Sequence, residues 1–89
     1  MKLYTAFDLH ANNSYGAIIG EQGQRVKRQR LANDPELIFQ FLSPYKAEIV
    51  GVVVESTYNW YWLVDALMSE GYRVHLANTA GIQKYKGLK

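Results

Sequence analysis

The order of strand-like and helix-like segments predicts an α/β fold with a five-stranded mixed sheet, in the order βββαβαβα. Three strand-like segments come first and are separated by short turns, which is typical of an antiparallel meander. Two more strand-like segments then alternate with helical patterns, which favours parallel pairing. The first of these, residues 49–54, is uniformly apolar, and this indicates a strand that is buried on both faces.

The meander is predicted from residues 3–9, 15–19 and 24–31. Turn-forming residues separate these segments: Ala11-Asn12-Asn13-Ser14 and Gly20-Glu21-Gln22-Gly23. The third segment carries basic residues at positions that face both sides of a strand, namely Arg25, Lys27, Arg28 and Arg30. Such a strand is expected at an exposed edge of the sheet.

A first helix is predicted to begin at Asn33-Asp34-Pro35-Glu36, which combines a capping side chain with proline and an acid in the first turn. Its apolar stripe comprises Leu37, Ile38, Phe41 and Leu42, and Ser43-Pro44 ends it. We therefore expect this helix to cover one face of the sheet.

A second helix is predicted after residue 55, with Ser56 or Thr57 as its N-cap and Gly71 at its end. Its apolar face is expected to comprise Trp60, Leu63, Val64, Leu67 and Met68. A strand over residues 72–77 follows. A short terminal helix is then expected to begin at Asn78 or Thr79 and to run through Ile82 and Tyr85.

Two acids directly follow apolar, strand-like segments: Asp8 near the end of the first and Glu55 at the end of the fourth. Right-handed crossovers favour a fourth strand that lies beside the first and parallel to it. Because adjacent strands are about 4.8 Å apart, the two carboxylates are expected to be close enough to share a divalent cation. Strand alternation allows His10 to line the same site, although a surface position explains this histidine as well.

Three stretches of the chain resemble a known family. They are Phe7-Asp8-Leu9-His10 with Asn12-Asn13, then Val54-Glu55-Ser56-Thr57-Tyr58-Asn59-Trp60-Tyr61-Trp62-Leu63, and Tyr72-Arg73-Val74-His75-Leu76-Ala77-Asn78. Together they resemble the N-terminal DEDD domain of insertion-sequence transposases. That group is related to the Piv/MooV DNA invertases and, more distantly, to RuvC-like Holliday junction resolvases. The resemblance covers essentially all 89 residues and implies a ribonuclease H-like fold.

The resemblance implies that Asp8 and Glu55 are the first two of the family's four catalytic, metal-binding acids. In the family, the other two lie beyond the stretch equivalent to Tyr85-Lys86-Gly87-Leu88-Lys89, as does a C-terminal domain that contributes a serine to strand transfer. We therefore expect residues 1–89 to be the N-terminal part of a longer transposase, truncated before the third and fourth acids. Asp65 and Glu70 cannot replace them, since both fall on or at the end of the second predicted helix.

By the same resemblance, the full-length protein is expected to cleave and transfer DNA strands with Mg²⁺ or Mn²⁺. DNA is the implied partner, and a guide RNA and self-association of the full-length transposase are also implied. With two of four acids, we expect this chain alone to be inactive and to bind metal weakly or not at all. No cysteine, signal peptide pattern or membrane-spanning apolar run is present, so a cytoplasmic protein without a membrane partner is expected. The resemblance to insertion-sequence transposases implies that it is prokaryotic.

Several of these residues have other interpretations. Asp8 can cap backbone amides in the following turn, and Glu55 can cap the second helix. The four basic residues of the third strand, together with Lys84 and Lys86, can bind nucleic-acid phosphates, but basic side chains also protect an edge strand from association. Aromatic residues near the second helix can stack on bases, although helical spacing places Trp60 on the core face. For Tyr58, Tyr61 and Trp62, both core packing and base stacking stay open as interpretations.

Two other classes of function compete with a transposase. An ATPase of the actin-like type has a similar order of elements, but it binds phosphates on a glycine-rich first turn, and the turn here has no glycine. A non-catalytic module of ribonuclease H-like fold, which binds nucleic acid or itself, is the stronger alternative. The net charge of +2 permits an anionic partner without requiring one.

Overall fold

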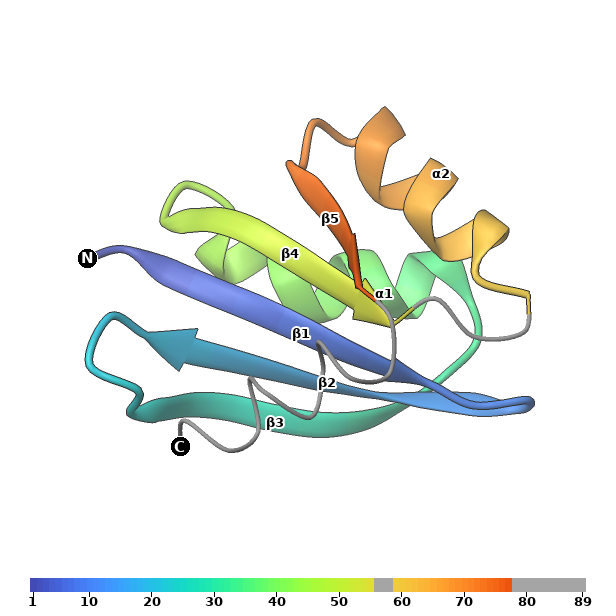
Figure 1. Ribbon diagram of the computed structural model, residues 1–89, viewed down its shortest axis with the longest axis horizontal. Helices are drawn as coiled ribbons and strands as arrows, with labels where there is room; N and C mark the ends of the chain where they lie inside the picture. The colour runs from blue at the N-terminus through green and yellow to red at the C-terminus, as the bar shows by residue number, and fades with distance from the viewer. Residues whose placement is uncertain (56–58, 78–89) are drawn as a thin grey trace.

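The computed structural model describes residues 1–55 and 59–77 (Figure 1). The meander is formed by β1 (Leu3–Leu9), β2 (Asn13–Gly20) and β3 (Arg25–Ala32). It is followed by α1 (Pro35–Leu42), a single 3₁₀ turn η1 (Ser43–Tyr45), β4 (Ile49–Glu55), α2 (Tyr61–Ser69) and β5 (Val74–Ala77). The predicted α/β class is therefore confirmed. The predicted terminal helix lies outside the described residues.

The five strands form one mixed sheet in the order β3-β2-β1-β4-β5. β2 pairs antiparallel with both β1 and β3, whereas β4 runs parallel to β1 and to β5. The fourth strand thus lies beside the first, and the basic third strand is at an edge, as predicted. In β4, Gly51 to Glu55 are all buried, but Val50 at the start of the strand is 38% exposed.

The two faces of the sheet differ in what covers them. Residues Leu3, Phe7 and Leu9 of β1 belong to one hydrophobic core with residues of α1 and α2, and we call this side the helix face. Figure 1 shows α1 running behind β4 on this side. The alternate residues of β1, Tyr4, Ala6 and Asp8, lie on the opposite side, which we call the distal face.

Helix α1 begins as the sequence predicts. The Asp34 side chain accepts a hydrogen bond from the Glu36 backbone N–H at 3.0 Å, and Pro35 occupies the first helical position. Ile38, Phe41 and Leu42 are buried against the sheet, and the Phe41 ring meets the Phe7 ring edge-on with centroids 6.1 Å apart. Leu37 is 36% exposed, so it is not part of the buried stripe.

Helix α2 begins later than predicted. Its N-cap residue is Trp60, without a side-chain capping hydrogen bond. Ser56 and Thr57, the predicted capping residues, lie outside the described residues. Asn59, with φ of 63°, adopts the left-handed conformation just before it and prevents an earlier start. Leu63 and Leu67 are buried as expected, but Met68 is 61% exposed and does not join the core face.

The end of α2 follows the prediction. Gly71 has φ of 87°, a conformation that glycine adopts at low cost after a helix. β5 then begins at Val74 rather than at residue 72, because the Tyr72 N–H still donates a hydrogen bond to the Leu67 carbonyl of α2, at 3.1 Å. Tyr72 is buried in the core, and the Arg73 carbonyl accepts a hydrogen bond from the Val52 N–H at 2.8 Å. Neither helix within residues 1–55 and 59–77 is long and apolar enough to cross a membrane.

Candidate metal centre

Asp8 and Glu55 lie next to each other at the carboxyl ends of two parallel strands. The register of β1 and β4 pairs Thr5 with Val52 and Phe7 with Val54, and each acid is the next residue of its strand. Adjacent strands are about 4.8 Å apart, so the register brings the two carboxylates to neighbouring positions on the distal face. Glu55 is 7% exposed, and the Asp8 side chain is 31% exposed.

His10 lies beside Asp8. Its Nε2 is 3.5 Å from Asp8 Oδ2, and its side chain is 56% exposed. The imidazole also meets the Tyr15 ring edge-on, with centroids 6.4 Å apart. His10 is therefore on the surface, as one of the two sequence interpretations predicts, and it lies beside the first acid.

The turn that follows Asp8 is held by a residue that the sequence interpretation assigned only to helix capping. The Asn33 amide nitrogen donates hydrogen bonds to the backbone carbonyls of His10 at 2.8 Å and Ala11 at 3.2 Å. The Asn33 side-chain oxygen Oδ1 accepts a hydrogen bond from the buried Ser14 hydroxyl at 2.7 Å. Asn33 thus links the β1–β2 turn to the segment between β3 and α1 and fixes the chain just beyond the first acid.

The basic residues of β3 are divided between the two faces. Arg28 and Arg30 contact the Tyr15 ring on the distal face, with Cζ 5.5 and 5.7 Å from its centroid. Arg25 pairs with Ile19 and shares that face. Lys27 is on the helix face, where its Nζ is 5.2 Å from the Phe41 ring centroid. Lys84 and Lys86 lie outside the described residues.

Helix α2 packs its buried residues Leu63 and Leu67 into the core on the helix face, whereas the carboxylates project on the distal face. Asp65 and Glu70 are exposed on and just after this helix, as the sequence predicts. Trp60 and Trp62 pack partly buried against the core. Tyr61 is 63% exposed and stacks on Trp60 with ring centroids 4.1 Å apart. Tyr58 lies outside the described residues.

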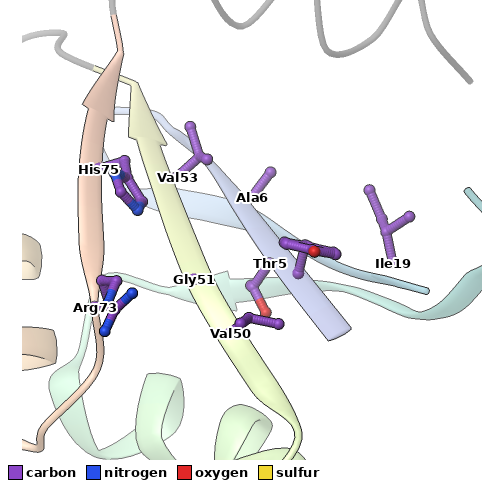
Figure 2. A pocket seen from close by; sticks show the side chains of 9 residues that line it. Thr5, Ala6, Ile19, Val50, Gly51, Val53, Arg73 and His75 are labelled. Atoms are coloured by element: carbon purple, nitrogen blue, oxygen red, sulfur yellow. The ribbon is translucent and has the colours of Figure 1, made fainter. Parts of the chain in front are cut away.

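A shallow hollow of about 270 Å³ lies on the distal face. Figure 2 shows His75 of β5 and Arg73, which directly precedes β5, at one side of it and Ile19 of β2 at the other. Ala6 and Val53 line it, and each lies two residues before one of the acids, so the hollow adjoins the carboxylates along the strands. Thr5 is the next residue along β1 from Tyr4, and its buried hydroxyl has no hydrogen-bond partner among the described residues.

The donor set fits a hard divalent cation in part. Carboxylate oxygens are the ligands that Mg²⁺ and Mn²⁺ prefer, and two of them are adjacent here. Within residues 1–55 and 59–77, however, there is no group of three or more His, Cys, Asp or Glu side chains that could hold a metal ion. Asp8 and Glu55 can therefore supply part of a coordination shell, which water or further ligands must complete.

Comparisons with known proteins identify no relative: no family model and no curated protein matches the chain.

Proposed function

We propose that the chain is the acid-bearing N-terminal part of the ribonuclease H-like catalytic domain of a DEDD-type DNA transposase. The observation that carries the proposal is the position of Asp8 and Glu55 at neighbouring carboxyl ends of parallel strands. Ligands of open α/β sheets bind at this edge, beyond the carboxyl ends of the strands. The first two of the three stretches that resemble the transposases include these strand ends, which supports the assignment further.

In the proposed function, Asp8 and Glu55 hold a divalent cation against the DNA backbone. When bound, the cation activates an attacking oxygen and stabilises the leaving oxygen during strand cleavage. Glu55 is suited to a fixed ligand because it is buried at the end of a central strand. His10 restricts the orientation of the Asp8 carboxylate through its contact at 3.5 Å, and Asn33 fixes the turn that carries His10.

Residues 1–89 by themselves carry two of the four acids that the resemblance to the transposases implies. Since two carboxylates fill only part of an octahedral shell, we expect purified residues 1–89 to bind Mg²⁺ weakly and to leave DNA intact. The remaining acids of the site would come from elsewhere in the full-length protein. Robust metal-dependent nicking of plasmid DNA by residues 1–89 alone would contradict this part of the proposal.

The test uses DNA strand exchange by the full-length protein with Mg²⁺ or Mn²⁺. Asp8→Asn and Glu55→Gln keep the side-chain shape but remove the charge, and each is expected to lower the rate on the order of 100-fold or more. Asp65→Asn is the matched control, because Asp65 is exposed on α2. Its rate should equal that of the wild type. Unchanged activity in either of the first two variants would refute the transposase assignment.

A non-catalytic nucleic-acid-binding module is the second candidate function. It is favoured by the absence, in the described part of the chain, of a group of three metal-binding side chains. Such a module would bind DNA equally well with Mg²⁺ and with EDTA, and the full-length protein would show no metal-dependent strand exchange. The two candidates therefore give opposite results in the same strand-exchange assay.

A further inference from the structure

Two arginines of the edge strand lie in line with the candidate metal centre. Tyr15 of β2 pairs with Asp8 of β1 on one side and with Arg30 of β3 on the other. Directly paired residues of neighbouring strands project to the same face, so these three side chains form a row across the distal face. Arg28 is two residues before Arg30 and projects to the same face.

Tyr15 holds both arginines in place. Their Cζ atoms are 5.5 and 5.7 Å from its ring centroid, within the range of a cation–π interaction. Both arginines are exposed, whereas Tyr15 is half-buried between the strands. Contact with a ring engages the flat surface of a guanidinium and leaves its N–H edge available for phosphate oxygens. Among the described residues, neither guanidinium forms an ion pair with a carboxylate.

The spacing suits a nucleic-acid strand. Two strand spacings, or about 10 Å, separate β1 from β3. This distance corresponds to about three stacked nucleotides at roughly 3.4 Å each. A strand with its reacting phosphate at Asp8 and Glu55 would therefore have a phosphate near Arg30 a few nucleotides away. Repulsion by the carboxylates is confined to one end of this row, and the positive charge lies at the other.

We propose that Arg28 and Arg30, held by Tyr15, bind the phosphate backbone of the DNA strand that reacts at Asp8 and Glu55. The identity of the ligand as DNA rests on the proposed function. The strand would cross the distal face from β4 to the edge strand β3. Lys27 lies outside this path, because its ammonium contacts Phe41 and Tyr45 on the helix face. The basic residues of β3 thus have different roles.

The test measures how salt affects the binding of a fluorescent single-stranded DNA oligonucleotide to the protein in EDTA. Removing two phosphate contacts in the Arg28→Ala/Arg30→Ala double variant should reduce the slope of log affinity against log salt by about 1.4. The fold-loss of affinity should then be about sevenfold larger at 50 mM salt than at 200 mM. Lys27→Ala, the matched control, should keep the wild-type slope.

A second pair of variants tests the role of the tyrosine. Tyr15→Phe keeps the ring and should bind like the wild type, while Tyr15→Leu should weaken binding in the same salt-dependent way as the arginine changes. Thermal unfolding of each variant checks that it is folded. If the double alanine variant is unfolded, Arg28→Gln with Arg30→Gln replaces it and should give the same loss of slope.

Any of three results would overturn the inference: an unchanged slope in the double variant, an equal loss of slope in Lys27→Ala, or no binding of the oligonucleotide by the wild type at 50 mM salt. Failure of this inference can be distinguished from failure of the proposed function, because EDTA removes metal from the binding assay. If Asp8→Asn leaves strand exchange intact while the arginines still govern binding, only the proposed function fails. If Asp8→Asn abolishes strand exchange but the slope is unchanged, only this inference fails.

Discussion

Asp8 depends on a neighbour that is distant in sequence. The turn after it has no glycine or proline to set its shape, and Asn33 supplies the fixing contacts through two backbone carbonyls and the Ser14 hydroxyl. The positions of the two acids near the ends of neighbouring strands could be predicted, because each follows an apolar segment. The contacts of Asn33 could not be predicted, because its sequence context indicates a local capping role. In the structure, its side chain instead forms hydrogen bonds to the turn between β1 and β2.

Asn33→Ala is therefore expected to destabilise the fold and loosen the turn beside Asp8. Losing these hydrogen bonds and leaving the buried Ser14 hydroxyl without its acceptor should lower the free energy of unfolding by about 1–3 kcal/mol. Urea denaturation measures this change. Asn12→Ala, an exposed position in the same turn, should change the free energy by less than about 0.5 kcal/mol. Equal effects of the two substitutions would show that Asn33 does not hold the turn.

Among the elements, strands were predicted better than the start of the second helix. The strand-forming residues of β1 and the uniformly apolar run in β4 place both strands correctly, because strands select residue types that leave a direct mark on the sequence. The start of α2 was wrong because Ser56 and Thr57 are good capping residues, yet Asn59 takes a left-handed conformation that the helix cannot include. Met68 fits the helical period but is 61% exposed, so the period alone does not decide which residues are buried.

Packing between α1 and the meander depends on the missing side chain of Gly16. A Cβ atom there would lie 2.8 Å from Phe41 Cε2 and 2.8 Å from Phe7 Cε1, both atoms of buried rings. Gly16→Ala is thus expected to lower the free energy of unfolding by about 1–3 kcal/mol through overpacking.

Gly51→Ala is the matched control for Gly16→Ala. Gly51 is also a buried strand glycine, but its nearest neighbour would be His75 Cδ2 at an ordinary contact distance of 3.5 Å. It should be neutral or slightly stabilising, since alanine restricts the unfolded chain more than glycine. Urea denaturation of both variants distinguishes them, and similar destabilisation in both would rule out the contact with the two phenylalanines as the cause.

For the whole molecule, the sheet order could be predicted because right-handed crossovers leave few alternatives for an apolar strand after a meander. The division of the sheet into a helix face and a distal face follows from the same order. It decides which side chains share a face with Asp8 and Glu55. Sequence alone placed basic residues on both sides of β3 but could not say which of them share a face with Asp8. That depends on the β1–β2–β3 register, and a bulge near Ile18 changes the alternation partway along β3.

The pH dependence of global stability should reveal the burial of Tyr72. Desolvation, with a further contribution from the charge of Glu70, raises the pKa of Tyr72 above its ordinary value of 10.0. Above that pH the unfolded chain loses the phenolic proton while the folded chain keeps it, so folding stability should fall as pH rises. Tyr72→Phe should show a shallower fall of unfolding free energy between about pH 9.5 and 11. A fall in Tyr72→Phe as steep as that of the wild type, or steeper, would rule out Tyr72 as the cause.

The proposed binding of one divalent cation by Asp8 and Glu55 together can be measured with paramagnetic Mn²⁺, because this ion broadens nearby amide NMR signals even when binding is weak. At substoichiometric Mn²⁺, we expect the signals of Asp8 and Glu55 and their immediate neighbours to broaden first. Both Asp8→Asn and Glu55→Gln should abolish this effect, and Asp65→Asn should leave it unchanged. Broadening centred on other acids, such as Asp34 and Glu36, or unchanged broadening in the first two variants, would contradict the account.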